Sequence, residues 1–332
     1  MDDIDVPRWW KRSAEKILKN RWRKILVVGA TDCGKSAYCG FLCRTLCAAG
    51  FPVAFVDADV GQKDVGPPAT ISLALLEGEV EFSNIQSEKL YFVGGTSPRG
   101  RMLPMIVGTR KLVDAADAPF LVIDTTGLVH GPGRVLKAFQ IDSIQPDAIV
   151  CIERHEELEP LVRSFRTHNI IRIRASRRAV SKSGQARIAA RKRLFKAYFE
   201  RAKTISLNFS DIVFQRFPIL GGIPIDVDGC EYAEKYPDGI IGVSGITTEE
   251  ISRSGIAVLP SGFERNLLCG VLDSHSEMMG LAILEEIDFR SETASLFTPV
   301  PSGKIAIVQS GDLYLDREGR ELGKARYLPK NF

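Results

Sequence analysis

The chain has 332 residues, of which 45% are hydrophobic and 26% are charged, and its formal net charge is +3. This composition excludes a disordered chain and supplies enough apolar side chains for two domains of ~100 to 200 residues. No run approaches the ~20 apolar residues of a membrane span, and the charged N-terminus lacks the apolar stretch of a secretion signal, so we expect a cytoplasmic protein with no membrane partner. The seven cysteines form no C-x-x-C pair, which predicts free thiols in a reducing compartment.

An N-terminal helix is predicted over about Trp9 to Asn20, within an N-terminal segment of residues 1–22. This segment contains three tryptophans, Trp9, Trp10 and Trp22. They could stack on a nucleotide base, but packing of the helix against a core is the favoured interpretation of large amphipathic rings in this position.

A phosphate-binding loop is indicated by the segment Gly29-Ala-Thr-Asp-Cys-Gly-Lys-Ser36, which matches the pattern G-x-x-x-x-G-K-[ST]. An apolar run, Lys24 to Val28, precedes the segment, and a helical pattern, Lys35 to Ala49, follows it, as such a loop requires. In this geometry the loop amides bind phosphate, Lys35 reaches the β- and γ-phosphate oxygens, and the Ser36 hydroxyl binds Mg²⁺. The predicted nucleotide-binding residues are Gly29, Ala30, Thr31, Asp32, Cys33, Gly34, Lys35, Ser36 and Ala37.

The predicted ligand of this loop is ATP with Mg²⁺. The sequence has no N-K-x-D type guanine-reading motif, but the lack of that motif does not decide against GTP or another nucleoside triphosphate. Three cysteines, Cys39, Cys43 and Cys47, repeat every four residues along the following helix, and core packing is favoured over a metal site because no histidine joins them.

Two carboxylates follow the second predicted strand, Val53 to Val56, in the segment Val56-Asp57-Ala-Asp59-Val-Gly-Gln62. Because side chains alternate along a strand, Asp57 and Asp59 point in different directions and can do different work. One can hold Mg²⁺ through water while the other accepts the proton of an attacking hydroxyl group. An Asp at a strand end can instead cap a helix, but the neighbouring phosphate loop favours the catalytic interpretation.

Strands and helices alternate over most of the chain, which predicts an α/β fold with a parallel sheet and helices on both of its faces. The further strands are expected near Leu90 to Val93, Phe120 to Ile123, Ala148 to Ile152 and Ile170 to Ile173, and the further helices near Arg101 to Ala116, Gly133 to Ile141 and Glu156 to Thr167. The strand at 120–123 runs into Asp124-Thr-Thr-Gly127. An apolar run that closes on an acid makes Asp124 a second candidate metal ligand.

A strongly basic segment extends from residue 172 to 203, with twelve Lys or Arg against one acid, Glu200, so that it carries +11 and the remainder of the chain −8. Such a segment can contact ATP phosphates or a nucleic-acid backbone, or can be an ordinary solvated helix face. Within it, Arg187 and Arg191 lie one helical turn apart. Planar guanidinium groups suit the charge of a transferring phosphoryl group, so we predict a mobile basic lid over residues 174–203 that supplies catalytic arginines.

After about Leu207 the sequence consists of short β-rich runs separated by Gly, Pro and Ser, which predicts a smaller C-terminal β domain, residues 207–332, as a partly closed barrel. The runs cover residues 239–245, 255–259, 267–272, 281–287 and 304–315, with Asp316-Arg-Glu-Gly319 as a hairpin turn. Residues 23–206 are then the phosphate-loop domain.

Together these motifs resemble the polynucleotide 5'-hydroxyl kinases of pre-mRNA 3'-end cleavage and of ribosomal RNA processing. The matching segments are the phosphate loop, Asp57-Ala-Asp-Val-Gly-Gln62, Pro67-Pro-Ala-Thr-Ile-Ser72, Gly94-Gly-Thr-Ser-Pro98, Asp124-Thr-Thr-Gly127 and an R-x-x-x-R lid that ends in Lys196-Ala-Tyr-Phe199. The likeness covers about residues 24–205, and the C-terminal stretch is more loosely similar to that family's β domain. The chain looks like the short form, without the extra N-terminal β domain of the eukaryotic members.

The resemblance implies a role for each motif. Lys35 and Ser36 would bind phosphate and Mg²⁺, Asp59 would activate the 5'-hydroxyl group, which leaves Asp57 for the metal, and Arg187 and Arg191 would be the lid arginines. The implied substrate-binding residues, most of them in a clasp for the terminal nucleotide, are Gln62, Thr96, Ser97, Pro98, Thr125, Thr126, Gly127 and His130. Many members have a tryptophan where this chain has Leu128 and a lysine where it has His130, so base stacking is expected to come from elsewhere.

The function predicted from the sequence is ATP-dependent phosphorylation of the 5'-hydroxyl end of RNA, DNA or both. Two alternatives stay open: a non-catalytic RNA-processing subunit that binds ATP as a structural ligand, and a regulatory NTPase that switches partners or loads metal. Transfer of phosphate to an oligonucleotide distinguishes the first prediction from both alternatives.

Overall fold

The computed structural model describes residues 6–81, 85–176, 179–245 and 256–324. The chain divides into two compact units, Met1–Arg191 and Lys192–Phe332. This division falls inside a helix, ahead of the predicted domain boundary at residue 206, which stays a prediction. Parts of the predicted segments lie outside the described residues. These parts are residues 1–5 of the N-terminal segment, 82–84 of the phosphate-loop domain, Arg177 and Arg178 of the lid, and 246–255 (with Gly255 of a predicted run) and 325–332 of the C-terminal β domain.

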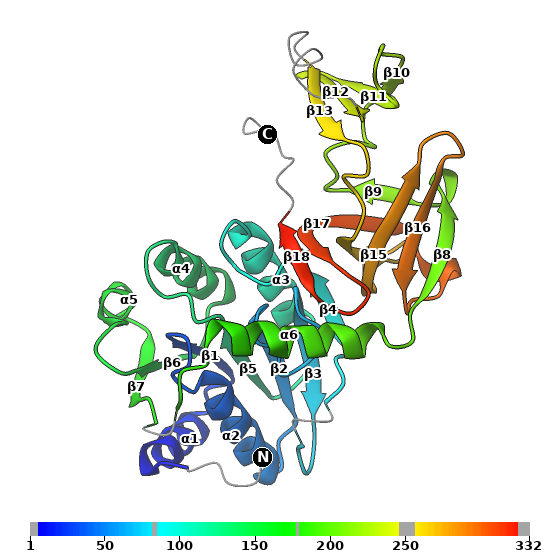
Figure 1. Cartoon of the computed structure of the whole chain (residues 1–332). Helices are drawn as coiled ribbons and strands as arrows, with labels where there is room; N and C mark the ends of the chain where they lie inside the picture. The colour runs from blue at the N-terminus through cyan, green and yellow to red at the C-terminus, as the bar shows by residue number, and fades with distance from the viewer. Residues whose placement is uncertain (1–5, 82–84, 177–178, 246–255, 325–332) are drawn as a thin grey trace. The chain divides into compact units, whose positions relative to one another are not determined.

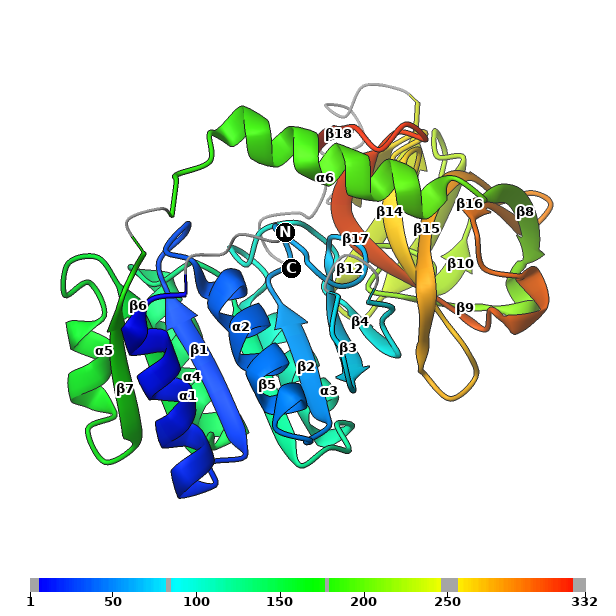
Figure 2. The same ribbon diagram turned by 90° about the horizontal axis from the view of Figure 1, so that it is seen from below.

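The first unit contains one sheet with the strand order β4-β3-β2-β5-β1-β6-β7 (Figures 1 and 2). Its strands are β1 (Lys24–Gly29), β2 (Val53–Ala58), β3 (Thr70–Leu76), β4 (Lys89–Phe92), β5 (Phe120–Thr125), β6 (Ala148–Glu153) and β7 (Asn169–Arg174). The run from β2 through β5, β1 and β6 to β7 pairs in parallel, which confirms the predicted phosphate-loop sheet. Strand β3 was not predicted; it pairs antiparallel with β2 and with β4, because only a loop rather than a crossover helix precedes it.

Helices cover both faces of this sheet, as predicted (Figure 1). These helices are α1 (Arg8–Asn20), α2 (Lys35–Ala48), α3 (Met102–Asp114), α4 (Pro132–Ile144) and α5 (Glu159–Ser164), and the division between the two units falls within the next helix, α6 (Gly184–Phe199). Helix α5 is shorter than expected because Glu157 accepts hydrogen bonds from the amides of Arg154 and His155 and holds the preceding residues in a turn. Within the described ranges, none of the helices has the length and apolar character that a membrane span needs.

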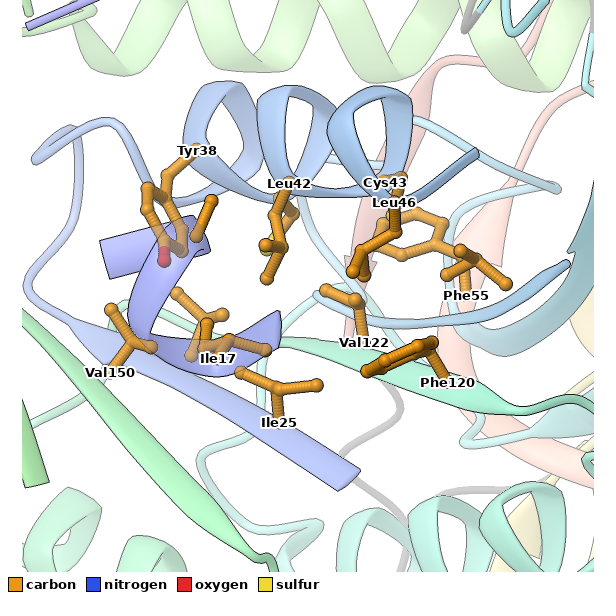
Figure 3. Close-up of a cluster of buried hydrophobic side chains, with 14 of the residues drawn as sticks. Ile17, Ile25, Tyr38, Leu42, Cys43, Leu46, Phe55, Phe120, Val122 and Val150 are labelled. Atoms are coloured by element: carbon orange, nitrogen blue, oxygen red, sulfur yellow. The ribbon is translucent and has the colours of Figure 1, made fainter. Parts of the chain in front are cut away.

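The core lies on both sides of the sheet because successive side chains of each buried strand point to opposite faces. In β1, Ile25 and Val27 join the cluster under α1 and α2, whereas Leu26 and Val28 join the cluster under α3, α4 and α5. Helix α2 directs Tyr38, Leu42, Cys43 and Leu46 toward the sheet (Figure 3). All seven cysteines are free thiols, and the stripe Cys39, Cys43 and Cys47 is buried in this core, as predicted.

The second unit is β-rich, as predicted, and its described residues form two sheets. One has the order β10-β11-β12-β13, and the other β18-β17-β14-β15-β16-β8, with β9 beside β17. The elements are β8 (Lys203–Asn208), η2 (Phe209–Asp211), β9 (Val213–Gln215), β10 (Ile223–Ile225), β11 (Tyr232–Tyr236), β12 (Gly239–Ser244), β13 (Ile256–Pro260), β14 (Leu267–Leu272), β15 (Met278–Asp288), β16 (Thr293–Thr298), η3 (Ser302–Lys304), β17 (Ile307–Leu315) and β18 (Glu321–Lys324).

Among the described residues no ladder joins the outer strands β18 and β8 of the larger sheet, so the partly closed barrel stays a prediction. The predicted hairpin turn is present between β17 and β18, where the Gly319 amide donates to the Asp316 carbonyl oxygen at 3.0 Å. The C-terminal half of α6 belongs to this unit, since Phe199 stacks on Phe297 and the Leu281 amide donates to the Tyr198 hydroxyl at 2.7 Å.

The N-terminal tryptophans differ in burial, which yields a test of their role. Trp10 is 1% exposed and packs edge-on against Tyr38 at 5.4 Å, whereas Trp9 is 44% exposed. We predict that Trp10→Ala lowers the free energy of unfolding by ~3–5 kcal/mol because it leaves a large cavity. Trp9→Ala is the matched control and should change it by less than about 1 kcal/mol. Urea unfolding measures both, and equal effects would contradict this packing.

Candidate active site

The pairing of three central strands brings the acidic motifs beside the phosphate loop. In the parallel ladders, Asp57 of β2 pairs with Asp124 of β5, and Asp124 pairs with Val27 of β1. The loop that begins at Gly29 leaves the same end of β1. The predicted acids and the loop therefore meet at the carboxyl edge of the sheet, where ligands of such sheets bind.

The phosphate loop has the conformation that anion binding requires. Asp32 and Gly34 adopt positive φ angles of 58° and 93°, and α2 begins directly afterwards at Lys35. The N-terminal amides of α2 therefore face the loop, where a phosphate would complete their hydrogen bonds. The buried Lys35 ammonium donates to the Ala30 carbonyl oxygen at 2.9 Å, so its charge stays at the loop.

Ser36 and Asp124 form a donor set that fits a divalent cation. The Ser36 hydroxyl donates to Asp124 Oδ2 at 2.7 Å, while the buried Oδ1 of Asp124 has no hydrogen-bond partner. Burial raises the pKa of Asp124 to about 7; Lys35 opposes this shift, and the carboxylates of Asp57 and Asp59 add to it. A bound cation would satisfy the orphaned oxygen and restore the carboxylate charge, so these two residues suit Mg²⁺.

Asp57, also predicted as a metal ligand, has both carboxylate oxygens engaged within the chain. Oδ2 accepts the amides of Asp64 and Val65 at 2.9 and 3.0 Å. Oδ1 accepts the Asp59 amide at 3.0 Å and lies 3.2 Å from the Lys63 ammonium. These contacts hold the loop between β2 and β3 in place, which gives Asp57 a structural role in this conformation.

Asp59, the predicted base, is half-buried, and one of its two carboxylate oxygens is hydrogen-bonded within the chain. Its Oδ1 accepts the amides of Gly61 and Gln62 at 2.9 and 3.1 Å. Within the described part of the chain nothing donates to its Oδ2, so this oxygen can accept a proton or hydrogen bond from a substrate. Gln62 is predicted to bind substrate, and in this structure its backbone amide orients the carboxylate of Asp59.

Two glycines allow the predicted clasp loops to approach closely. A Cβ on Gly61 would lie 2.8 Å from the Thr96 carbonyl oxygen, and one on Gly127 would lie 2.4 Å from Thr31 Oγ1. Both positions therefore need glycine, because a side chain would force the loops apart. The loop after β2 thus lies against Thr96, and the segment after β5 lies against the phosphate loop.

The remaining predicted clasp residues take different positions. Thr125 turns into the sheet and donates to the Val27 carbonyl oxygen at 2.8 Å, so its side chain stabilises the strands rather than facing a substrate. Ser97 accepts the Arg99 amide at 3.3 Å, in a turn that begins at Pro98. Thr126 is buried, whereas His130 is exposed beyond the end of β5.

The lid is joined to the phosphate loop by Asp32. Its Oδ2 accepts hydrogen bonds from the Lys182 amide at 3.0 Å, the Ser181 hydroxyl at 3.3 Å and Nη2 of Arg187, with which it also forms an ion pair. Burial opposes ionisation, but the hydrogen bonds from Lys182 and Arg187 lower the pKa of Asp32 below its ordinary value. Arg154 adds a second link, since its Nη2 donates to the carbonyl oxygens of Asp32 and Ala179, each at 2.8 Å.

The structure thus brings Arg187 to the phosphate loop, as its predicted role requires. Its Nε is buried without a hydrogen-bond partner, and a phosphate oxygen could accept from it. Arg191 follows one turn later on α6 and is half-buried.

Sequence reasoning missed several residues of this site, because no local pattern marks them. Arg101 is buried beside the clasp and donates to the Ser97 carbonyl oxygen at 2.8 Å. Solvent reaches Asp64, yet the protein atoms around it and the Asp57 carboxylate raise its pKa to about 6. The lid contacts of Asp32 and Arg154 join segments that are far apart in the sequence, and only their nearness to the recognised motifs could have marked them as candidates.

Comparisons with known proteins identify similar sequences and a similar fold. The profile of the family described as mRNA cleavage and polyadenylation factor CLP1 P-loop matches residues 29–201. The chain is 33% identical to a polyribonucleotide 5'-hydroxyl-kinase of Methanocaldococcus jannaschii over 90% of its own length and 89% of that protein, and 33% identical to one of Pyrococcus furiosus over 96% and 95%. Among solved structures, a wild-type Clp1p-Pcf11p complex matches with a TM-score of 0.64 at 12% identity over 92% of this chain and 79% of that one, a likeness of fold.

The Asp32 contacts predict a measurable effect on the lid. Asp32→Ala removes the acceptor of the Lys182 amide, so hydrogen exchange at that amide should accelerate at least about tenfold. The folded pKa of Asp32 lies below 3.8, so its contribution to lid stability is present at neutral pH and is lost as the pH falls through the lowered value. The difference between the two proteins should therefore disappear in acid.

Glu157→Ala is the matched control for this experiment. Glu157 accepts amides of the neighbouring turn but none from the described residues of the lid, so its loss should accelerate exchange at residues 154 and 155 alone. Unchanged exchange at Lys182 in Asp32→Ala would contradict the contact.

Proposed function

The chain belongs to the CLP1 P-loop family, and from this membership and the geometry of its site we propose an ATP-dependent polynucleotide 5'-hydroxyl kinase whose acceptor is the 5' end of RNA. The observation that carries the proposal is the meeting of three groups at one sheet edge: the phosphate loop, the Ser36–Asp124 pair and the carboxylate of Asp59. The names of the archaeal relatives support RNA as the acceptor.

The donor side of the reaction is formed by the phosphate loop and the two residues of the cation site. Lys35 exchanges its contact with the Ala30 carbonyl oxygen for the β- and γ-phosphate oxygens of ATP. Ser36 and Asp124 would hold Mg²⁺, which when bound neutralises charge on the β- and γ-phosphates. Asp57 keeps the adjacent loop in shape through the amides of Asp64 and Val65.

The acceptor side centres on Asp59. Its Oδ2 accepts the proton of the 5'-hydroxyl group while the 5' oxygen forms a bond to the γ-phosphorus, and the bond from that phosphorus to the β,γ-bridging oxygen breaks to release ADP. The amides of Gly61 and Gln62 fix the other oxygen and so orient the base. The fixed carboxylate holds the 5'-hydroxyl group in line with the γ-phosphate. Such positioning of the reactants accounts for much of the rate enhancement in enzymatic phosphoryl transfer.

The lid supplies positive charge to the transferring group. Arg187 already lies at the phosphate loop through Asp32, and its unpartnered Nε adds a donor for a γ-phosphate oxygen. Arg191, one helical turn away, is assigned to the same phosphoryl group. Their guanidinium groups, which are planar and always charged, stabilise the negative charge that spreads over the phosphoryl oxygens in the transition state.

Asp59→Asn tests the proposed base. We predict a loss of ~10²- to 10⁴-fold in kcat with ATP binding retained, because the amide cannot accept the proton. The measurement is transfer of labelled phosphate from ATP to a 5'-hydroxyl oligoribonucleotide. A wild-type protein that binds ATP without transfer would identify a structural ATP subunit, and phosphate release without oligonucleotide would identify a regulatory NTPase.

Arg187→Ala tests the lid. We expect kcat to fall ~10²-fold or more, by analogy with other arginines that act on a transferring phosphoryl group. Arg163→Ala is the matched control, because Arg163 is an exposed arginine of α5 that forms an ion pair with Glu159, and it should keep the wild-type rate. Equal rates for both variants in the same transfer assay would remove Arg187 from the mechanism.

A further inference from the structure

A buried lysine lies beside the proposed site and has no part in the scheme above. Lys137, on α4, has no exposed surface. Its ammonium donates to Thr126 Oγ1 at 3.3 Å and to Gln140 Oε1 at 3.4 Å. Both partners are neutral, and within the described residues no carboxylate forms an ion pair with it. When Lys137 is protonated, its positive charge is therefore held inside the protein by two long hydrogen bonds.

A buried lysine without a counter-ion lowers the stability of the fold, so stability does not explain why a lysine occupies position 137. A buried ammonium without a counter-ion loses its hydration and regains little from neutral acceptors. Lys63, the other fully buried lysine discussed above, shows the contrast: it donates to the Asp57 carbonyl oxygen at 2.6 Å and pairs with the Asp57 carboxylate at 3.2 Å. Lys63 thus has a partner of opposite charge, whereas the described residues supply none for Lys137.

The surroundings of Lys137 connect it to the reacting groups. Burial lowers its pKa to about 7; Lys35 lowers it further, while the charges of Asp59 and Asp124 oppose the shift. The ammonium is therefore electrostatically coupled to the phosphate-loop lysine, the proposed base and the proposed metal ligand. Charged groups retained at such a cost are typical of functional sites.

Thr126 connects Lys137 to the segment that lies against the phosphate loop. It lies between Asp124 and Gly127, and the Gly127 carbonyl oxygen accepts from the Thr31 hydroxyl of the phosphate loop at 3.4 Å. On the far side of Lys137, Gln140 donates to Thr109 Oγ1 at 3.3 Å, and Thr109 donates to the Met105 carbonyl oxygen at 2.6 Å. A continuous polar chain therefore extends from α3 across α4 to the segment after β5.

We infer that Lys137 is a positioning residue for phosphoryl transfer: its ammonium fixes Thr126, and through it the Asp124–Gly127 segment, against the phosphate loop. The inference rests on the proposed function, since it concerns the same reaction. Lys137 has no exposed surface with which to touch a substrate, so its effect passes through Thr126. It should therefore change the rate of the transfer step more than the binding of ATP.

Lys137→Met tests the inference, because methionine is an unbranched side chain without the charge. We expect kcat for transfer to a 5'-hydroxyl oligoribonucleotide to fall about 10- to 100-fold, with KM for ATP changed less than about threefold. The midpoint of urea unfolding should be unchanged or higher, because an unpaired buried charge has been removed. Lys63→Met is the matched control, and its midpoint should fall because Asp57 loses its counter-ion.

Thr126→Val, alone and combined with Lys137→Met, provides the second measurement. If Lys137 acts through Thr126, the double variant should be no slower than the slower single variant. Independent, multiplicative losses would overturn the inference, as would a wild-type kcat in Lys137→Met or a lowered unfolding midpoint that accounts for the lost activity. A wild-type protein without transferase activity would instead refute the proposed function, and this assignment with it.

Discussion

The parallel pairing of β2, β5 and β1 is the constraint on which the site depends. It places Asp57 beside Asp124 and Asp124 beside the strand that enters the phosphate loop. A shift of one residue in either ladder would turn these acids to the opposite face of the sheet. Apolar side chains on both faces fix the register, because such a shift would exchange the two buried clusters. Packing of the core therefore determines where Asp57 and Asp124 lie relative to the phosphate loop.

Three acids at one sheet edge have different surroundings, and these surroundings separate their roles. Asp57 is saturated by backbone amides and Lys63, Asp124 is buried with one oxygen unsatisfied, and Asp59 is oriented by two amides with one oxygen available. These different surroundings are the basis for the roles that we propose for them, namely a structural brace, a cation ligand and a proton acceptor. Asp32 adds a fourth arrangement, in which a loop carboxylate holds the lid.

The sequence predicted those parts of the fold and site that local patterns encode. The phosphate loop has a fixed motif, the strands that flank it have β-branched apolar runs, and Arg187 and Arg191 have helical spacing, so all could be located in advance. Strand β3 was missed because its antiparallel pairing depends on the loop from Gly61 to Ala69. The partners of Asp57, the link from Asp32 to the lid and the burial of Lys137 depend on contacts between distant segments, which residue spacing does not encode.

The central claim is that Asp59 faces the 5'-hydroxyl group while Ser36 and Asp124 face the donor's cation. A crystal structure with a non-hydrolysable ATP analogue, Mg²⁺ and a 5'-hydroxyl oligoribonucleotide tests it most directly. We predict that Asp59 Oδ2 lies about 2.6–3.2 Å from the 5' oxygen, and that this oxygen is in line with the bond to be broken. A complex in which Asp59 points away from the 5' oxygen would contradict the account.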